Sequence, residues 1–304
     1  RPEIADSALN QALVVRPGWE KVAMMRLSYL NQSDNRKQLA DYVETFLRNY
    51  PDSGELRITW ARLLAEWDEF EKALTQFTKL VEQGPENKEA VYAAAVLNME
   101  LGNDPMATRM FVRYLELDPE HDQSRLFLAR IAAGHDRFDD ALSWLSAVTS
   151  AEHIFDAQLR AAFVLADAKR ADEALAHLIQ MVPDSVPEQV RIYLAQERIL
   201  RQSEGLEAAL ELLDAALIDV PGHGDLLYAR GLVTAQLKLI DKHEADMRHL
   251  IELEPDNAHA YNALGYTLAD QTDRLDEALV LIERALDLLP EDPFILDSMG
   301  WVHY

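Results

Sequence analysis

The chain has 304 residues, 49% of them hydrophobic and 27% charged, and its 53 acidic against 29 basic residues give a formal net charge of −24. This acidity disfavours DNA, RNA and anionic membrane surfaces as partners, because all of them present phosphate. The absence of cysteine excludes disulfides and cysteine-ligated zinc, and there is no apolar run long enough to cross a membrane.

Prolines mark a regular period along the chain. One constant interval separates the prolines from Pro17 to Pro119, and the same interval recurs from Pro187 to Pro255. The gap between these two series is twice that interval, so the missing position falls at His153. The full series is Pro17, Pro51, Pro85, Pro119, Pro187, Pro221, Pro255 and, one residue late, Pro290. A fixed period of about 34 residues is typical of repeat architectures.

Small residues follow the same period. An alanine stands twelve residues before several of these positions, as at Ala73 and Ala107, and a large apolar residue follows four places later, as at Phe77 and Phe111. A small side chain lets two helices approach closely, and the residue one turn later fills the space beside it. Each period therefore predicts one pair of closely crossed helices.

This spacing resembles the tetratricopeptide repeat, a helix pair with the pattern W-x2-L-G-x2-Y followed by A-x3-F-x2-A-x4-P. The best copy runs from Tyr261 to Pro290 and reads YNALGYTLADQTDRLDEALVLIERALDLLP. The resemblance covers essentially the whole chain and implies an all-α fold, a right-handed α-solenoid of tetratricopeptide repeats. Arg230 and His243 occupy a leucine and an alanine place of the pattern, so a departure in packing is expected in the repeat from 224 to 257.

In chain order, residues 1–19 are predicted to be the second helix of a truncated repeat. Eight full repeats follow over residues 20–292, starting near residues 20, 54, 88, 122, 156, 190, 224 and 258. Residues 293–304 are predicted to be the first helix of a truncated ninth repeat. Both terminal helices are expected to expose apolar side chains such as Trp301, which favours self-association through the truncated ends.

Acidic residues are expected to cap the second helices. Segments that begin at Asp68, Asp136 and Asp273 each place a second acid three residues later, as in a capping box. Acids in the first turn also face the positive end of the helix dipole, which contributes roughly 0.3–1 kcal/mol each. Much of the negative charge then has a structural role, and the alternative is a dedicated site for a basic partner.

Catalytic and cofactor motifs are missing from the sequence. His243-Glu244 resembles the start of the metalloprotease HExxH motif, but position 247 is Met247 instead of the second histidine. There is no GxSxG, GxGxxG or P-loop motif. We therefore expect a non-enzymatic protein without a cofactor or a metal site.

Proteins of this family bind their partners mainly in the groove lined by first helices. On a common repeat numbering, three arginines hold one equivalent position in alternate repeats, and arginine offers five donors suited to carboxylates and peptide carbonyls. The predicted protein-binding groove comprises Arg62, Arg130, Arg198, Arg160, Arg191, Arg201, Tyr92, Phe127, Asn262 and Tyr266. The alternative is that these arginines pair with acids such as Glu66 and Glu100 and only stiffen the array.

Within the family, the segment from Tyr261 to the end resembles the repeat block of proteobacterial envelope proteins, above all pseudomonad outer-membrane lipoproteins that act as adaptors for a carboxyl-terminal processing protease. The resemblance implies that the protein binds and activates such a protease and presents substrates to it, for example cell-wall hydrolases. Two other functions stay open: the recognition arm of a larger enzyme, and a passive assembly scaffold for envelope or pilus components.

The same resemblance implies a periplasmic protein, anchored to the outer membrane through a lipidated N-terminus that precedes this chain. The first residues, RPEIADSALNQALVVRP, do not have the charged and apolar blocks of a signal peptide. Direct membrane insertion by this segment is therefore not expected. From the residues alone, either a targeting segment has been cut away or the protein is cytosolic.

Overall fold

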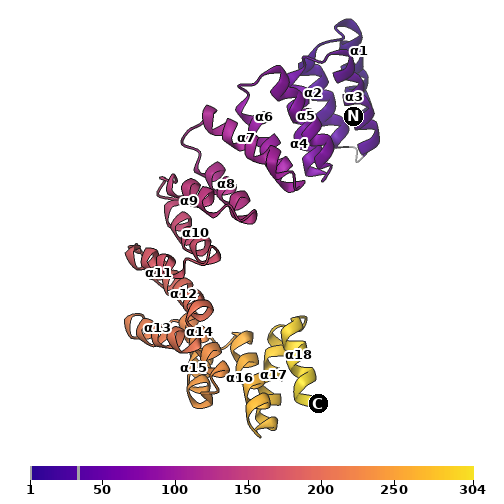
Figure 1. Cartoon of the computed structure of the whole chain (residues 1–304). Helices are drawn as coiled ribbons and strands as arrows, with labels where there is room; N and C mark the ends of the chain where they lie inside the picture. Colours follow the sequence, from indigo (N-terminus) through magenta and orange to yellow (C-terminus); the bar gives the residue numbers. More distant parts are fainter. Residues whose placement is uncertain (1, 33–34) are drawn as a thin grey trace. The chain divides into compact units, whose positions relative to one another are not determined.

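The fold is entirely helical in the part of the chain that the computed structural model describes, residues 2–32 and 35–304 (Figure 1). The predicted all-α repeat fold is confirmed. The helices of the N-terminal part are α1 (Pro2–Val15), α2 (Glu20–Asn31), α3 (Arg36–Asn49), α4 (Gly54–Glu66), α5 (Phe70–Gln83), α6 (Lys88–Glu100), α7 (Asp104–Leu117) and α8 (Asp122–Gly134). They are followed by α9 (Phe138–Ser146), α10 (Ile154–Asp167), α11 (Ala171–Gln180), α12 (Val186–Ser203), α13 (Leu206–Asp219), α14 (Gly224–Gln236), α15 (Ile240–Leu253), α16 (Ala258–Gln271), α17 (Leu275–Leu288) and α18 (Pro293–His303).

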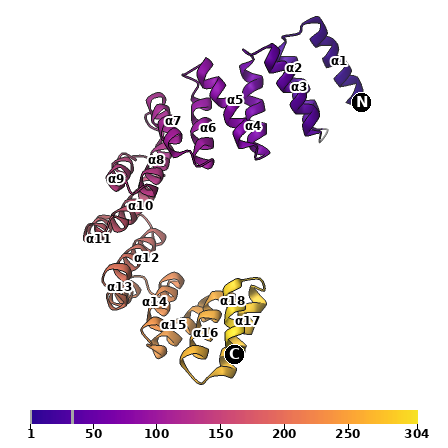
Figure 2. The same cartoon turned by 45° about the vertical axis from the view of Figure 1, so that its right-hand side comes forward.

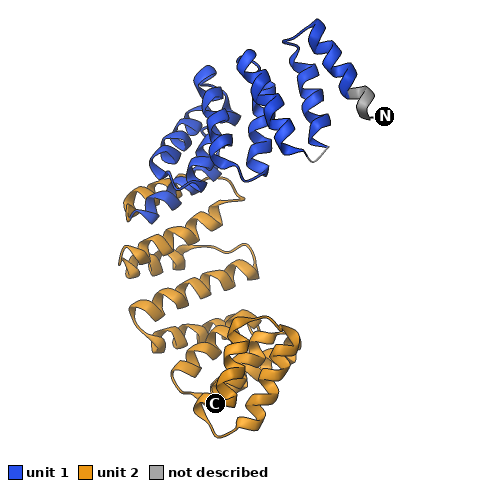
Figure 3. Cartoon of the chain, turned by 90° about the vertical axis from the view of Figure 1, so that its right-hand side faces the viewer, with its two compact units in different colours: residues 1–135 blue, residues 136–304 orange. Residues whose placement is uncertain are grey.

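Consecutive helices pack as pairs that are joined by short turns, namely α2 and α3, α4 and α5, α6 and α7, α10 and α11, α12 and α13, α14 and α15, and α16 and α17 (Figure 2). We call the earlier member of each pair the first helix and the later member the second helix, and by the repeat period α8 is also a first helix and α1 and α9 are second helices. The first helices of neighbouring pairs also contact each other, as α10 and α12 do. The chain divides into two compact units, residues 1–135, which include α8, and residues 136–304, which include α9 (Figure 3).

The predicted close helix crossings are present within the pairs. A Cβ atom added to Gly265 on α16 would lie 2.7 Å from Ile282 Cγ1 and 3.0 Å from the backbone oxygen of Ala278 on α17. Only glycine fits this distance without displacing its neighbours. The alanines at the equivalent crossings are fully buried, namely Ala73, Ala107, Ala174, Ala209 and Ala278, and Ala141 on α9 is also fully buried.

The periodic prolines lie just after the second helices. The residue before each proline is driven out of the α region by the proline ring, which ends the helix. Tyr50, Gly84 and Asp118 accordingly have ψ values of 71°, 85° and 81° at the ends of α3, α5 and α7. Pro187 is the exception, because it lies in the first turn of α12 and begins a helix. This helix starts at Val186, four residues before the predicted repeat start, and is 18 residues long.

The prediction that aspartates cap the second helices was wrong. Asp68 and Asp136 have positive φ values of 61° and 56° and lie in the turns before α5 and α9. The N-cap residues of α5, α9 and α17 make no side-chain capping hydrogen bond. The turn between the helices requires a left-handed residue, and the amide of Glu69 closes it by donating to Leu64 O at 2.9 Å. Equivalent left-handed positions are held by Gly102, Lys169, Gly205 and Lys238.

The repeat of α14 and α15 packs around polar groups, as its departures from the family pattern suggested. Arg230 donates to both carboxylate oxygens of Asp246, at 2.9 and 2.6 Å, and to Asp214 at 2.8 Å. His243 is fully buried, and its Nδ1 lies 2.8 Å from the backbone oxygen of Gly231. Hydrogen bonds therefore take the place of the apolar contacts that leucine and alanine would make.

Candidate protein-binding site

Two neighbouring first helices of the second unit, α10 and α12, line a pocket of about 380 Å³. Since equivalent positions of adjacent repeats face the same side of the array, side chains of both helices converge on it. The lining residues are Asp156, Leu159, Arg160, Phe163, Arg191, Leu194, Ala195 and Arg198. Three of the six arginines predicted for the groove therefore lie together, and we call this site the α10–α12 pocket.

The three guanidinium groups of the pocket differ in their partners. Arg191 Nη2 lies 2.6 Å from Asp156 Oδ1. The Cζ atom of Arg198 lies 5.0 Å from the centre of the Phe163 ring. In the described part of the chain, neither Arg160 nor Arg198 has a carboxylate within the 4.0 Å of an ion pair. Two cationic groups of the pocket are thus free to meet an anion.

The net charge of the pocket is positive, whereas the net charge of the whole chain is negative. Three arginines against one aspartate leave a formal surplus of two positive charges in a chain of net charge −24. The face of Phe163 holds the Arg198 guanidinium through a cation–π contact, which contributes about 0.5–1 kcal/mol at an exposed site. An entering carboxylate therefore meets oriented arginines and does not have to displace another acid.

Arg201 and Arg62 are paired elsewhere. Arg201 Nε lies 2.8 Å from Glu197 Oε1 on its own helix, α12. Arg62 Nη2 on α4 lies 2.6 Å from Glu89 Oε1 on α6. The alternative prediction of ion pairs between neighbouring repeats describes Arg62, with Glu89 in place of the expected Glu66 or Glu100, whereas Arg201 pairs within its own helix.

Tyr92, Phe127 and Arg130 lie where α6, α7 and α8 meet. The Phe127 ring stacks on Phe111 with centroids 5.2 Å apart, and Tyr92 meets the same Phe111 ring edge-on at 6.1 Å. Burial raises the pKa of the Tyr92 hydroxyl above its ordinary value. Exposed Arg130 covers the Phe127 ring at 5.5 Å and donates to Met99 Sδ. The two aromatic residues thus serve packing as well as any surface role.

Asn262 and Tyr266 lie on α16, outside the α10–α12 pocket. Tyr266 is 40% exposed. The Oδ1 atom of Asn262 is buried and accepts no hydrogen bond from any described residue. The structure therefore separates these two residues from the arginines with which the sequence grouped them.

Phe163 and Asp156 were missed by the sequence analysis, although both define the pocket. Asp156 stands 35 positions before Arg191 and Phe163 stands 35 positions before Arg198, which is close to one repeat. Such a separation places each partner on the neighbouring first helix. A search for aromatic or acidic residues about one repeat away from each arginine would have found them.

Over residues 2–32 and 35–304, no helix combines the length and the apolar character needed to cross a bilayer. The same residues contain no group of three or more acidic or histidine side chains that could hold a metal ion.

Known proteins resemble the chain in sequence. The tetratricopeptide repeat family model matches residues 58–107 and 244–293. TPR repeat-containing protein PA4667 of Pseudomonas aeruginosa is 37% identical over 183 residues, which are 60% of this chain and 31% of that protein. The chain thus spans about a third of the length of this curated relative.

Solved structures resemble the chain in fold. The structure of Naa15/Naa10 bound to HypK-THB has a TM-score of 0.56 at 13% identity, and the match covers 97% of this chain and 62% of that chain. The C-terminal part of a TPR repeat-containing protein from Cytophaga hutchinsonii has a TM-score of 0.51 at 14% identity, covering 80% and 99%. At these identities the similarity concerns the fold alone.

Proposed function

Because the chain is an array of tetratricopeptide repeats, we propose that it is a protein-binding scaffold whose α10–α12 pocket holds an acidic segment of a partner protein. Proteins with these repeats mediate protein–protein interactions, which supports the general role. The observation that carries the specific proposal is that Arg160 and Arg198 have no acidic partner within the described residues and line one pocket.

The chemistry of the pocket selects for a carboxylate. A guanidinium binds a carboxylate through two parallel hydrogen bonds, which fixes the orientation of the bound group. A hydrogen bond to a charged group contributes about 1.5–3 kcal/mol. Leu159, Leu194 and Ala195 add apolar surface beside the cations. A segment with an acidic residue next to an apolar one fits this combination.

Within this role we propose a narrower function, that of an adaptor which binds and activates a carboxyl-terminal processing protease and presents its substrates. The proposal includes a periplasmic location and a lipid anchor N-terminal to this chain. Its support is the resemblance of residues 261–304 to adaptors of this kind and the relationship to a repeat protein of P. aeruginosa.

The test is capture of partners from a bacterial envelope extract on the immobilised chain, read by mass spectrometry. The double variant Arg160→Ala/Arg198→Ala removes the unpaired cations of the pocket. The matched control Arg109→Ala/Arg284→Ala removes the same charge from the second helices α7 and α17. We expect one set of proteins to be retained by the wild type and the control and lost from the pocket variant.

The outcomes of this experiment test the scaffold proposal and the adaptor proposal separately. Equal capture by the pocket variant and the wild type would show that the α10–α12 pocket is not the binding site. Pocket-dependent capture without a carboxyl-terminal processing protease or cell-wall hydrolases would support the scaffold and reject the adaptor.

A further inference from the structure

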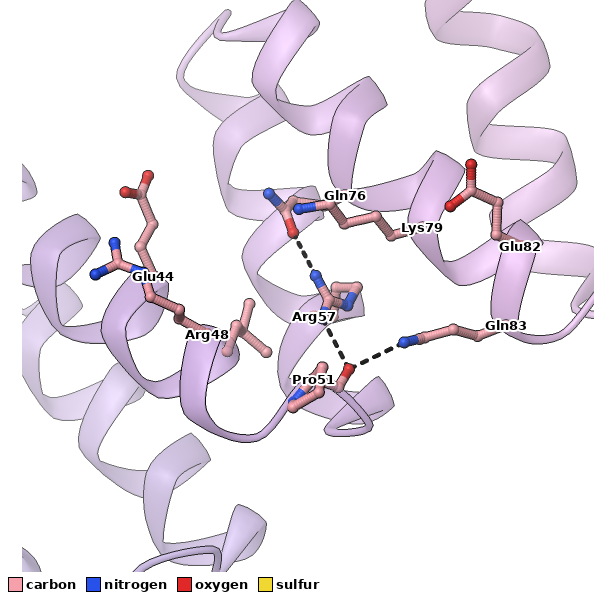
Figure 4. A pocket seen from close by; sticks show the side chains of 9 residues that line it. Glu44, Arg48, Pro51, Arg57, Gln76, Lys79, Glu82 and Gln83 are labelled. Carbon is pink, nitrogen blue, oxygen red and sulfur yellow. Dashed lines mark hydrogen bonds between the residues drawn. The ribbon is translucent and has the colours of Figure 1, made fainter.

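The first unit contains a buried arginine that forms no ion pair with a carboxylate of the described residues. Arg57 on α4 is 3% exposed and lines a pocket of about 490 Å³ between α3, α4 and α5 (Figure 4). Its Nη1 donates to Gln76 Oε1 and its Nη2 donates to the backbone oxygen of Pro51, both at 2.8 Å. Its Nε has no hydrogen-bond acceptor in the described part of the chain. A buried guanidinium with only neutral acceptors is unusual, because burying a charge without a counter-charge is costly.

An arginine at the equivalent position two repeats further on can be compared with Arg57. Arg125 on α8 holds the equivalent position, and its Nη2 also donates to the backbone oxygen of the proline six residues earlier, Pro119. Arg125 Nη1, however, donates to the carboxylate of Asp122 at 2.6 Å. The residue equivalent to Asp122 is Gly54, and no other residue comes within 4 Å of a Cβ atom placed there. At Arg57 the neutral amide of Gln76 therefore holds the place that a carboxylate holds at Arg125.

The side chains around Arg57 create an environment for one further negative charge. Arg48 on α3 and Lys79 on α5 are exposed at the rim, as are Glu44 and Glu82. None of the four forms an ion pair with another described residue. Burial lowers the pKa of Arg57 because the charged form is poorly solvated, and the nearby carboxylate of Asp52 opposes part of this shift without accepting a hydrogen bond from Arg57. An arginine remains charged under these conditions, so Arg57 stays a buried cation whose hydrogen-bond acceptors are neutral.

We propose that this pocket, the Arg57 pocket, binds a peptide carboxylate, which displaces the Gln76 amide from Arg57 Nη1 in the way that Asp122 occupies Arg125. A charge-assisted hydrogen bond replaces a neutral one, and the former is roughly twice as strong. The acids close to the pocket, Glu44, Glu82 and Asp52, suit a monoanionic carboxylate better than a phosphate dianion. The site lies between α3, α4 and α5 of the first unit and shares no residue with the α10–α12 pocket.

The test is an NMR titration of the whole chain that follows the Nε–H resonance of Arg57. Three pentapeptides distinguish the source of the carboxylate: acetyl-AADAA-amide carries it on a side chain, acetyl-AAAAA with a free end carries it at the C-terminus, and acetyl-AANAA-amide carries none. Inorganic phosphate is the fourth probe. We expect a saturable shift of the Arg57 resonance with at least one carboxylate peptide and none with the asparagine peptide.

Two variants at one open position make the test specific. Gly54→Asp supplies the missing carboxylate from the chain itself, at a place where an added Cβ atom has free space around it. It should weaken binding of the carboxylate peptide at least about tenfold, whereas its neutral isostere Gly54→Asn should leave the affinity within about twofold. The proposal is overturned if neither carboxylate peptide binds, if only phosphate binds, or if Gly54→Asp binds the peptide as tightly as the wild type. Because these variants lie in the first unit, the result is read separately from that of the capture experiment.

Discussion

Two regions of the second unit use arginine in opposite ways. Along α14–α17, Arg230, Arg248 and Arg274 are each bonded to two carboxylates. In the α10–α12 pocket, two of three arginines have no acidic partner among the described residues. Both regions consist of helix pairs, although α12 is longer than its counterparts, with 18 residues. The placement of the acidic residues decides which arginines hold repeats together and which remain available to a partner.

The paired region should lose the most stability when one partner is removed. Asp246 is buried, with its side chain 5% exposed, and depends on Arg230 for its charge-assisted bonds. We expect Arg230→Ala to lower the free energy of unfolding by about 3 kcal/mol, because an unpaired carboxylate would remain in the interior. Urea unfolding followed by circular dichroism measures the change. Replacing both partners in Arg230→Leu/Asp246→Ala should recover most of the loss, and a double variant as unstable as Arg230→Ala would contradict the account.

The same region should also respond to acid. Hydrogen bonds from Arg274, and then from Arg248, lower the pKa of Glu244 from 4.5 to about 2. A carboxylate with a lowered pKa stabilises the fold above its ordinary pKa, and this contribution is lost as the pH falls from 4.5 towards 2. We expect Glu244→Gln to cost about 1–2 kcal/mol at pH 7 and almost nothing at pH 2, since protonation then removes the same bonds in the wild type. Urea unfolding at a series of pH values tests this, and a cost independent of pH would show that Glu244 is not held ionised by its arginines.

The backbone turns offer a comparison in which the two regions should behave alike. Lys169 follows α10 and Lys238 follows α14, and both have positive φ values, 63° and 59°. Glycine adopts this conformation without the strain caused by a Cβ atom, so each lysine-to-glycine change should raise the free energy of unfolding by about 0.5–1 kcal/mol. Thermal and urea unfolding of the two variants provide the measurement. A gain at one turn and a loss at the other would mean that the regions differ in backbone as well as in charge.

Only a small effect on stability is expected in the pocket itself. Arg160 and Arg198 are exposed, so Arg160→Ala/Arg198→Ala should lower the free energy of unfolding by no more than about 1 kcal/mol in total, mostly through loss of the contact between Arg198 and Phe163. Urea unfolding of this variant, measured in parallel with Arg230→Ala, compares the loss of stability in the two regions. A loss as large as that of Arg230→Ala would make these arginines structural and would remove the basis for a binding site.

The fold was largely predictable because its signals are steric and recur in each repeat. The prolines end second helices by excluding the α region from the preceding residue, and the alanines allow close crossings. Both effects act over a few residues and need no knowledge of distant contacts. The capping aspartates were misread because a left-handed turn and a helix cap favour the same residue types.

The site was predictable only in part because ion pairing depends on geometry across repeats. The sequence grouped ten residues by position, and the structure brings Arg160, Arg191 and Arg198 together. It pairs Arg62 with Glu89, which lies 27 positions away and which the repeat numbering did not indicate. A shift of one helical turn changes which acid a long arginine side chain reaches. The partners of an arginine therefore have to be read from the structure.

The most direct test of the central claim is the dissociation constant of a captured partner for the wild type and for Arg160→Ala/Arg198→Ala, measured by isothermal titration calorimetry at low and at physiological salt. The account predicts that the pocket variant binds at least about tenfold more weakly at low salt and that its affinity depends less on salt, because two attractive charges are gone. An unchanged dissociation constant with an unchanged salt dependence would contradict it, and would assign binding to another surface of the chain.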